Sequence, residues 1–127
     1  MSNNKSILII DDDKFILDVF SRILKNQGYN VDTAETGQKA LEKLKTKKFD
    51  LAIIDMILPD TNGTRLIPKM NEIQPEIKKI VLTGYPSAAD SNKTKKQGVN
   101  AYLIKPVKSE KIIETITKSL KQQKQQP

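Results

Sequence analysis

Residues 7–13 read ILIIDDD, and this stretch decides the fold class of the chain. A short apolar run that ends abruptly in charge is typical of a strand buried on both faces. The pattern recurs in LAIID at residues 51–55 and in YLIKP at residues 102–106, where the charged residues are Asp55 and Lys105. In an open parallel sheet, ligands bind at the carboxyl ends of the strands. We therefore expect carboxylates and a lysine to converge on one pocket.

Apolar runs alternate with helix-like segments along the chain, which is typical of a parallel α/β sheet. Strands are expected near residues 6–11, 30–34, 50–55, 79–83 and 101–104. The first helix should be capped by Asp13, carry apolar residues at four-residue spacing from Phe15 to Leu24, and stop before Gly28. The second should start at Thr36. In the third helix, Pro68 should limit where the regular part begins.

The last third of the chain holds two more expected helices. The one near residues 87–97 has only two alanines as apolar anchors, so we expect it to be the least firmly packed and the moving part. The next should use Ser109 as its cap and present an isoleucine-rich face to the core. Residues 1–121 are expected to form one domain, and the polar residues 122–127 a disordered tail.

Composition narrows the chemistry. The 127 residues include no cysteine and no histidine, which excludes disulfides, thiol nucleophiles, imidazole acid–base catalysis and the usual zinc sites. A bound metal must therefore use oxygen ligands, which favours magnesium, manganese or calcium. We find neither a secretory signal nor a membrane-spanning run, so a cytoplasmic location is expected.

The net charge of +7 is concentrated near the end of the chain, where residues 92–127 hold nine lysines against two glutamates. A solvated face is the first interpretation and an acidic protein partner the second. Lysines without arginine or aromatic neighbours argue against nucleic acid. This charge would also oppose pairing of two such faces, which favours a monomer.

The clustered aspartates indicate phosphoryl chemistry. Carboxylates held close together repel one another, which raises a pKa or requires a cation. Magnesium is expected because it is commonly held by one or two carboxylates together with a phosphate. A carboxylate can attack phosphorus to form an acyl phosphate. Phosphoryl transfer needs mainly positioning and charge neutralisation, which a metal, a lysine and a hydroxyl can supply.

Four motifs, ILIIDDD, LAIIDMILPDTNG, IVLTGYPS and AYLIKP, occur in this order at the ends of the first, third, fourth and fifth expected strands. Together they resemble the receiver domain of two-component response regulators, over nearly the whole chain. The resemblance implies a doubly wound, flavodoxin-like sheet of five parallel strands in the order 2-1-3-4-5. It also implies a signalling switch rather than an enzyme, apart from catalysis of its own phosphoryl acceptance and hydrolysis.

The resemblance assigns the acidic residues by position. Asp55 corresponds to the phosphoacceptor, which takes its phosphoryl group from a partner histidine kinase or histidine phosphotransfer protein. Asp11 and Asp12 correspond to the acid pair that binds Mg²⁺, with Mn²⁺ as the alternative, together with Asp55 and the backbone carbonyl of Ile57. Since the chain has no histidine, the donor must be another protein or a small acyl phosphate.

Three further residues match the switch of such domains. Thr83 corresponds to the hydroxyl that moves to bond the phosphoryl group, Lys105 to the lysine that pairs with its oxygens, and Tyr102 to an aromatic switch residue. Their movement would change the surface formed by residues 87–97, the strand at 101–104 and the following helix, through which a downstream protein is controlled. A plain edge aromatic is the alternative for Tyr102.

Four positions around the pocket complete the resemblance. Ile57 and Tyr85 stand where the family tunes loss of the phosphoryl group to water, and an apolar and a bulky residue there suggest slow loss. Gly84 should leave room for the phosphoryl group. By family analogy alone, Pro106 should follow a cis peptide bond.

Three other functions stay open. A phosphatase of the haloacid dehalogenase class would use Asp11 and Asp13 as an acid-x-acid pair with Thr83 and Lys105, although Phe15 and the short chain do not fit that class. A flavodoxin-like cofactor binder needs a first loop that cradles phosphate, which three aspartates would repel. The third is a binding module that works without phosphorylation.

Overall fold

The computed structural model describes residues 4–85 and 96–122. Its elements in chain order are β1 Ser6–Ile10, α1 Lys14–Asn26, β2 Asn30–Ala34, α2 Gly37–Thr46, β3 Leu51–Asp55, α3 Gly63–Ile73, β4 Lys78–Thr83, β5 Ala101–Ile104 and α5 Ser109–Lys121. All five expected strands are confirmed to within a residue at either end. The helix expected near residues 87–97 and the tail expected from residue 122 fall almost entirely outside the described residues.

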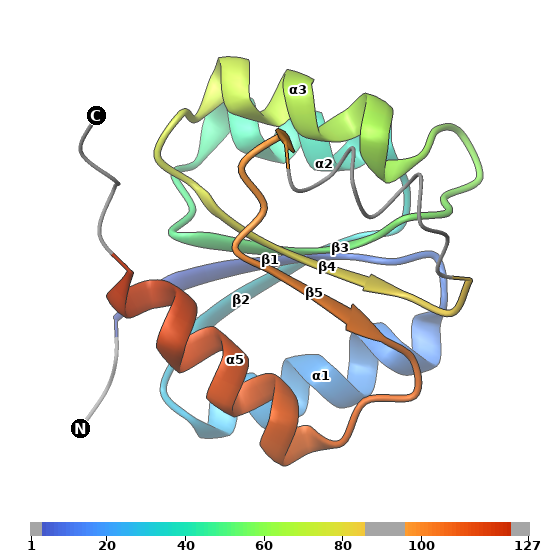
Figure 1. Cartoon of the computed structure of the whole chain (residues 1–127). Helices are drawn as coiled ribbons and strands as arrows, with labels where there is room; N and C mark the ends of the chain where they lie inside the picture. Colours follow the sequence, from blue (N-terminus) through green and yellow to red (C-terminus); the bar gives the residue numbers. More distant parts are fainter. Residues whose placement is uncertain (1–3, 86–95, 123–127) are drawn as a thin grey trace.

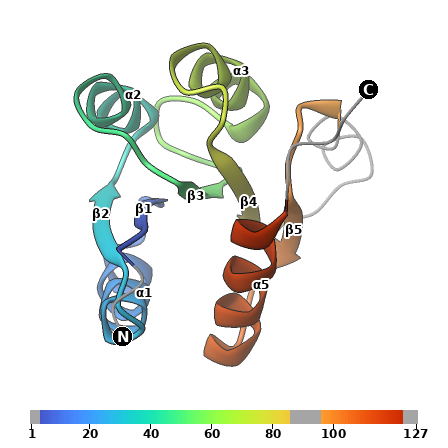
Figure 2. The same ribbon diagram turned by 90° about the vertical axis from the view of Figure 1, so that its left-hand side faces the viewer.

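The five strands form one parallel sheet in the order β2-β1-β3-β4-β5, which confirms the expected flavodoxin-like topology. Helices cover both faces (Figures 1 and 2): α1 and α5 lie on one side, and α2 and α3 on the other. Because all strands run in the same direction, their carboxyl ends share one edge. Any side chain that follows a central strand is therefore carried to that edge.

The core consists of two apolar layers, one on each face of the sheet. In β1, Ile7 and Ile9 pack toward α1 and α5, while Leu8 and Ile10 pack toward α2 and α3. Burying such side chains on both faces contributes about 1.5–3 kcal/mol each, which explains the continuous apolar runs of the central strands. The helices supply buried partners on each face: Leu17, Phe20, Leu24, Ile112 and Ile116 on one, and Ala40, Leu44, Leu66, Ile67 and Met70 on the other.

Of the two expected helix caps, Asp13 and Ser109, the first is confirmed. Asp13 accepts a hydrogen bond from the backbone N–H of Phe15 at the start of α1, and Thr36 caps α2. The prediction for Ser109 is wrong, because Ser109 is the first residue of α5 and Lys108 occupies the cap position without a side-chain hydrogen bond. The Ser109 hydroxyl is directed to its neighbour Glu110, at 3.4 Å, and the buried isoleucines of α5 fix where the helix packs.

Helix α3 also departs from expectation, since it starts at Gly63 and continues through Pro68. Proline has no N–H, so the carbonyl of Thr64, four residues earlier, loses its usual intrahelical donor. The side-chain amide of Gln97 donates to this carbonyl at 2.9 Å, and Asn71 donates to the carbonyl of Gln97 at 3.2 Å. A residue distant in sequence thus replaces the missing helical hydrogen bond.

Within the described residues, the helices are too short or too polar for any of them to cross a lipid bilayer.

An acidic pocket at the carboxyl edge of the sheet

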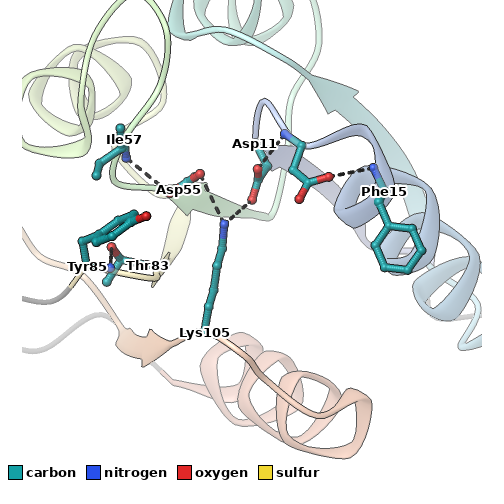
Figure 3. A network of polar contacts seen from close by, with 8 residues as sticks. Asp11, Phe15, Asp55, Ile57, Thr83, Tyr85 and Lys105 are labelled. Carbon is teal, nitrogen blue, oxygen red and sulfur yellow. Dashed lines mark hydrogen bonds and ion pairs between the residues drawn. The ribbon is translucent and has the colours of Figure 1, made fainter.

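The ends of four adjacent strands bring the predicted pocket residues together (Figure 3). Asp11 directly follows β1, Asp55 is the last residue of β3, Thr83 is the last residue of β4, and Lys105 directly follows β5. The sheet places β3 between β1 and β4, with β5 next to β4. The convergence of charge expected at this edge is therefore present in the structure.

Lys105 connects the two buried carboxylates of the pocket. Its Nζ atom lies 3.0 Å from Oδ2 of Asp11 and 3.3 Å from Oδ2 of Asp55. Asp11 is only 2% exposed and Asp55 only 7%. Each carboxylate uses its other oxygen to accept a backbone N–H, from Asp13 to Asp11 at 2.9 Å and from Ile57 to Asp55 at 3.2 Å. Both side chains are thus held in a fixed orientation.

The pocket shifts the pKa of both Asp55 and Lys105. Burial raises the pKa of Asp55, and the nearby Asp11 charge raises it further, while the Ile57 N–H and Lys105 act in the opposite direction. For Lys105, burial lowers the pKa of the amine, but the hydrogen bond and charge of Asp11, followed by those of Asp55, outweigh it and raise the pKa overall. One lysine between two carboxylates leaves an excess of negative charge.

A third carboxylate, on the exposed Asp12, adds to this excess. Asp11, Asp12 and Asp55 each offer an oxygen, and the three oxygens lie within 4.8 Å of one another. Such a cluster of oxygen donors fits a hard divalent cation such as Mg²⁺ or Mn²⁺. The cation would contribute the positive charge that Lys105 alone does not supply.

The other predicted residues lie around this centre. Thr83 is fully buried, and its hydroxyl accepts a hydrogen bond from the backbone N–H of Tyr85 at 3.1 Å. A Cβ added at Gly84 would come 4.0 Å from Cδ of Lys105, and the room expected there for a phosphoryl group stays a prediction. The peptide bond between Lys105 and Pro106 is cis, as the family analogy predicts.

Tyr102 lies in β5, opposite Val81 of β4, and is half-buried. Its ring packs against the apolar layer that contains α2 and α3. It belongs to the strand that leads to Lys105, but it is set back from the carboxylates. Its expected switch role therefore remains a prediction.

Exposed large apolar residues stand close to pocket residues along the chain. Phe15, Ile57, Tyr85 and Ile104 are the exposed large hydrophobic residues of residues 4–85 and 96–122, and we refer to these four as the apolar collar. Phe15 and Tyr85 are 73% and 76% exposed. A mostly apolar cavity of about 520 Å³ adjoins Phe15 between α1 and the β5–α5 connection, and Lys105 contributes to its lining.

Sequence reasoning identified two members of the collar and missed the others. Ile57 and Tyr85 were found through their positions two residues after Asp55 and Thr83. Phe15 was missed because the four-residue spacing of α1 suggested a core position, and Ile104 because it continues an apolar strand. The proximity of Phe15 to the acidic run and of Ile104 to Lys105 is the signal that could have identified them.

Comparison with known proteins identifies the family of the chain. The model of the response regulator receiver domain matches residues 7–117. The chain belongs to this family. The receiver domain is 34% identical over 116 residues to the transcriptional regulatory protein GlrR of Escherichia coli, covering 91% of this chain and 26% of GlrR. The chain thus spans about a quarter of that relative's length.

Solved structures agree on the receiver fold. A CheY-like receiver domain protein from Methanospirillum hungatei is 41% identical and superposes with a TM-score of 0.90, covering 93% of this chain and 94% of that one. A response regulator from Burkholderia pseudomallei, 33% identical with a TM-score of 0.83, covers 88% of this chain and 66% of its own. That structure contains a phosphorylated aspartic acid, a calcium ion and citrate.

Proposed function

We propose that this receiver domain accepts a phosphoryl group on Asp55 from a histidine kinase or a histidine phosphotransfer protein. The observation that carries the proposal is the cluster of Asp11, Asp12 and Asp55 oxygens within 4.8 Å, with the Lys105 amine 3.3 Å from Asp55. The phosphorylated aspartic acid and the calcium ion of the Burkholderia relative support it. Mg²⁺ would be held by the three carboxylates and by the backbone carbonyl of Ile57.

In the reaction, a carboxylate oxygen of Asp55 forms a bond to phosphorus while the bond from phosphorus to the donor's histidine nitrogen breaks. The histidine ring leaves with the electron pair of that bond, and an acyl phosphate remains on Asp55. When bound, Mg²⁺ neutralises the negative charge that collects between carboxylates and phosphoryl oxygens. Lys105 already contacts Asp55, so a short movement of its amine would pair it with the new phosphoryl group.

The phosphoryl group would act on the rest of the protein through Thr83. Its buried hydroxyl now accepts the N–H of Tyr85, and turning toward the phosphoryl oxygens would break that hydrogen bond. Tyr85 would then be released from the end of β4. Together with Tyr102, this change would alter the surface made by residues 87–97, β5 and α5, which controls a downstream protein.

The apolar collar favours a protein as the donor. A phosphohistidine can reach Asp55 only if its carrier approaches the pocket, and the exposed side chains of Ile57 and Tyr85 and the cavity beside Phe15 lie near it (Figure 3). Exposed apolar side chains gathered around one site are typical of protein interfaces. A small phosphate ester would make little use of them.

The proposal is tested by intact mass measurement after incubation with acetyl phosphate and Mg²⁺. Wild-type protein should gain one phosphoryl group, and the gain should disappear with EDTA or in Asp55→Asn. If Asp55→Asn gained the same mass, the acceptor assignment would be wrong. Steady release of phosphate that is lost in Asp11→Asn but kept in Asp55→Asn would instead support the dehalogenase-type phosphatase.

A further inference from the structure

The loop that joins β3 to α3 is attached at its tip to a helix elsewhere in the chain. Asp60, in this loop, accepts the backbone N–H of Gly37 at 2.9 Å with one carboxylate oxygen and that of Gln38 at 2.9 Å with the other. Gly37 and Gln38 are the first two residues of α2. The N–H groups of a first helical turn have no partners within the helix, and a negative charge there is favoured by the helix dipole.

The contact between loop and helix is close. A Cβ added at Gly37 would lie 2.4 Å from the Thr61 methyl carbon and 3.5 Å from Asp60, so any larger residue here would have to displace the Thr61 side chain. Asp60 and Gly37 are 23 residues apart in the sequence, so the contact is a tertiary one. The two hydrogen bonds accepted by the Asp60 carboxylate and the close packing at Gly37 together hold the tip of the loop on α2.

The loop is also closed internally, so that its tip and its start form one unit. Leu58 donates its N–H to the carbonyl of Thr61 at 3.1 Å, and Gly63 donates to the carbonyl of Met56 at 2.9 Å. Ile57 pairs with Asn62 across the loop. A displacement of the tip would therefore be passed to Ile57 through these backbone contacts.

Ile57 connects this unit to the pocket, because its N–H donates to Asp55 (Figure 3). We propose that Asp60 is a positioning residue for the cation and phosphoryl site. By holding the loop on α2, it keeps the Ile57 backbone in place, with the N–H on Asp55 and the carbonyl available to the cation. This inference rests on the proposed function, in which that carbonyl is a ligand.

The competing explanation is that Asp60 only caps α2. Thr36 offers a matched control, because its hydroxyl caps the same helix by accepting the N–H of Lys39, a residue of α2, at 3.1 Å. Asp60→Ala and Thr36→Ala both remove a cap from α2. Only Asp60→Ala also releases the loop that carries Ile57. An effect confined to Asp60 therefore separates positioning from capping.

The experiment is a Mg²⁺ titration of the full chain followed by two-dimensional amide NMR, which reports folding and the dissociation constant together. Removing a residue that orients a metal ligand typically weakens metal binding 10–100-fold. We expect Asp60→Ala to raise the dissociation constant about tenfold, at the low end of that range, and to shift the Ile57 amide resonance. Thr36→Ala should stay within about twofold of the wild type, since it leaves every loop contact intact.

Asp60→Asn distinguishes position from charge. Its amide oxygen can keep one of the two hydrogen bonds, so its dissociation constant should fall between those of the wild type and Asp60→Ala. Equal weakening by the Asn and Ala variants would show that only charge matters and overturn the inference, as would equal values for Asp60→Ala and Thr36→Ala. If the wild type bound no Mg²⁺, the proposed function would fail with it; wild-type binding that Asp60→Ala left unchanged would overturn this inference alone.

Discussion

Replacing Lys105 by methionine tests whether this lysine is the counter-ion that stabilises the pocket before a cation binds. Methionine keeps much of the unbranched apolar stem and removes the charge. Asp11 and Asp55 would then face each other without the amine that now lies 3.0 and 3.3 Å from them. Their repulsion and their burial would both oppose folding.

The expected size follows from the burial of the three groups. Removing one partner of a fully buried ion pair costs about 3–5 kcal/mol. The Lys105 side chain is 22% exposed, so solvent already screens part of the interaction. We therefore expect Lys105→Met to lower the free energy of unfolding by about 2–3 kcal/mol at neutral pH in EDTA. For a domain of this size, that corresponds to a fall in Tm of roughly 10 °C.

Urea denaturation in EDTA and in saturating Mg²⁺ provides the assay. The penalty should shrink in Mg²⁺, because the cation neutralises the same carboxylates. It should also shrink in the Asp55→Asn background, where a double-mutant cycle isolates the coupling between Lys105 and Asp55. A penalty below about 0.5 kcal/mol, within the range of a neutral surface substitution, would refute the reasoning. So would a penalty that is the same with and without Mg²⁺.

The pH dependence of this penalty has a defined sign. The pKa of Lys105 is raised, so its contribution is fully present below the ordinary lysine value of 10.5 and is lost as the pH rises through the raised value. The pKa of Asp55 is raised above 3.8, so acidification protonates it in the folded state first and removes one ion pair. The difference between wild type and Lys105→Met should thus be constant near neutrality and narrow in acid.

Three further substitutions test other features. Ile57→Asn should shorten the half-life of the acyl phosphate severalfold, measured by mass decay after gel filtration, because an amide can orient water where isoleucine cannot; an unchanged half-life would contradict the expected role of Ile57. Lys79→Met should raise the free energy of unfolding in urea by about 1–2 kcal/mol, because burial lowers the pKa of this amine and makes its charge costly; the gain should fade toward pH 10.5, and a loss of stability at neutral pH would contradict the argument. Gly37→Ala should lower Tm through a cost of about 1–3 kcal/mol, since its Cβ would meet the Thr61 methyl carbon at 2.4 Å; an unchanged Tm would show that the loop yields.

The pocket could be predicted from the sequence because two local rules agree there. A buried strand has a continuous apolar run, and parallel strands bring whatever follows them to one edge. Asp11, Asp55, Thr83 and Lys105 each follow or end such a run, so their convergence required no knowledge of distant contacts. The strand order could not be predicted from these two rules, and it was expected only from the resemblance to a family.

The errors arose where tertiary contacts override a local rule. Pro68 should have limited α3, but Gln97 supplies a donor from outside the helix. Phe15 has the spacing of a core residue, but it lies at the margin of the buried face of α1 and is exposed. The Asp60 contact with α2 could not be foreseen, because no sequence rule joins a loop carboxylate to a helix start 23 residues earlier.

The hydrogen bond from Gln97 to the Thr64 carbonyl makes the stability of α3 depend on the position of a residue far away in the sequence. If residues 96–100 moved away from α3, this carbonyl would have to find water, at a net cost of about 0.5–1.5 kcal/mol. Opening of the first turn of α3 and displacement of Gln97 are thus linked, and their amides should exchange with solvent as one cooperative unit. A substitution or a bound partner that shifts Gln97 should thus change the stability of α3, 33 residues away along the chain.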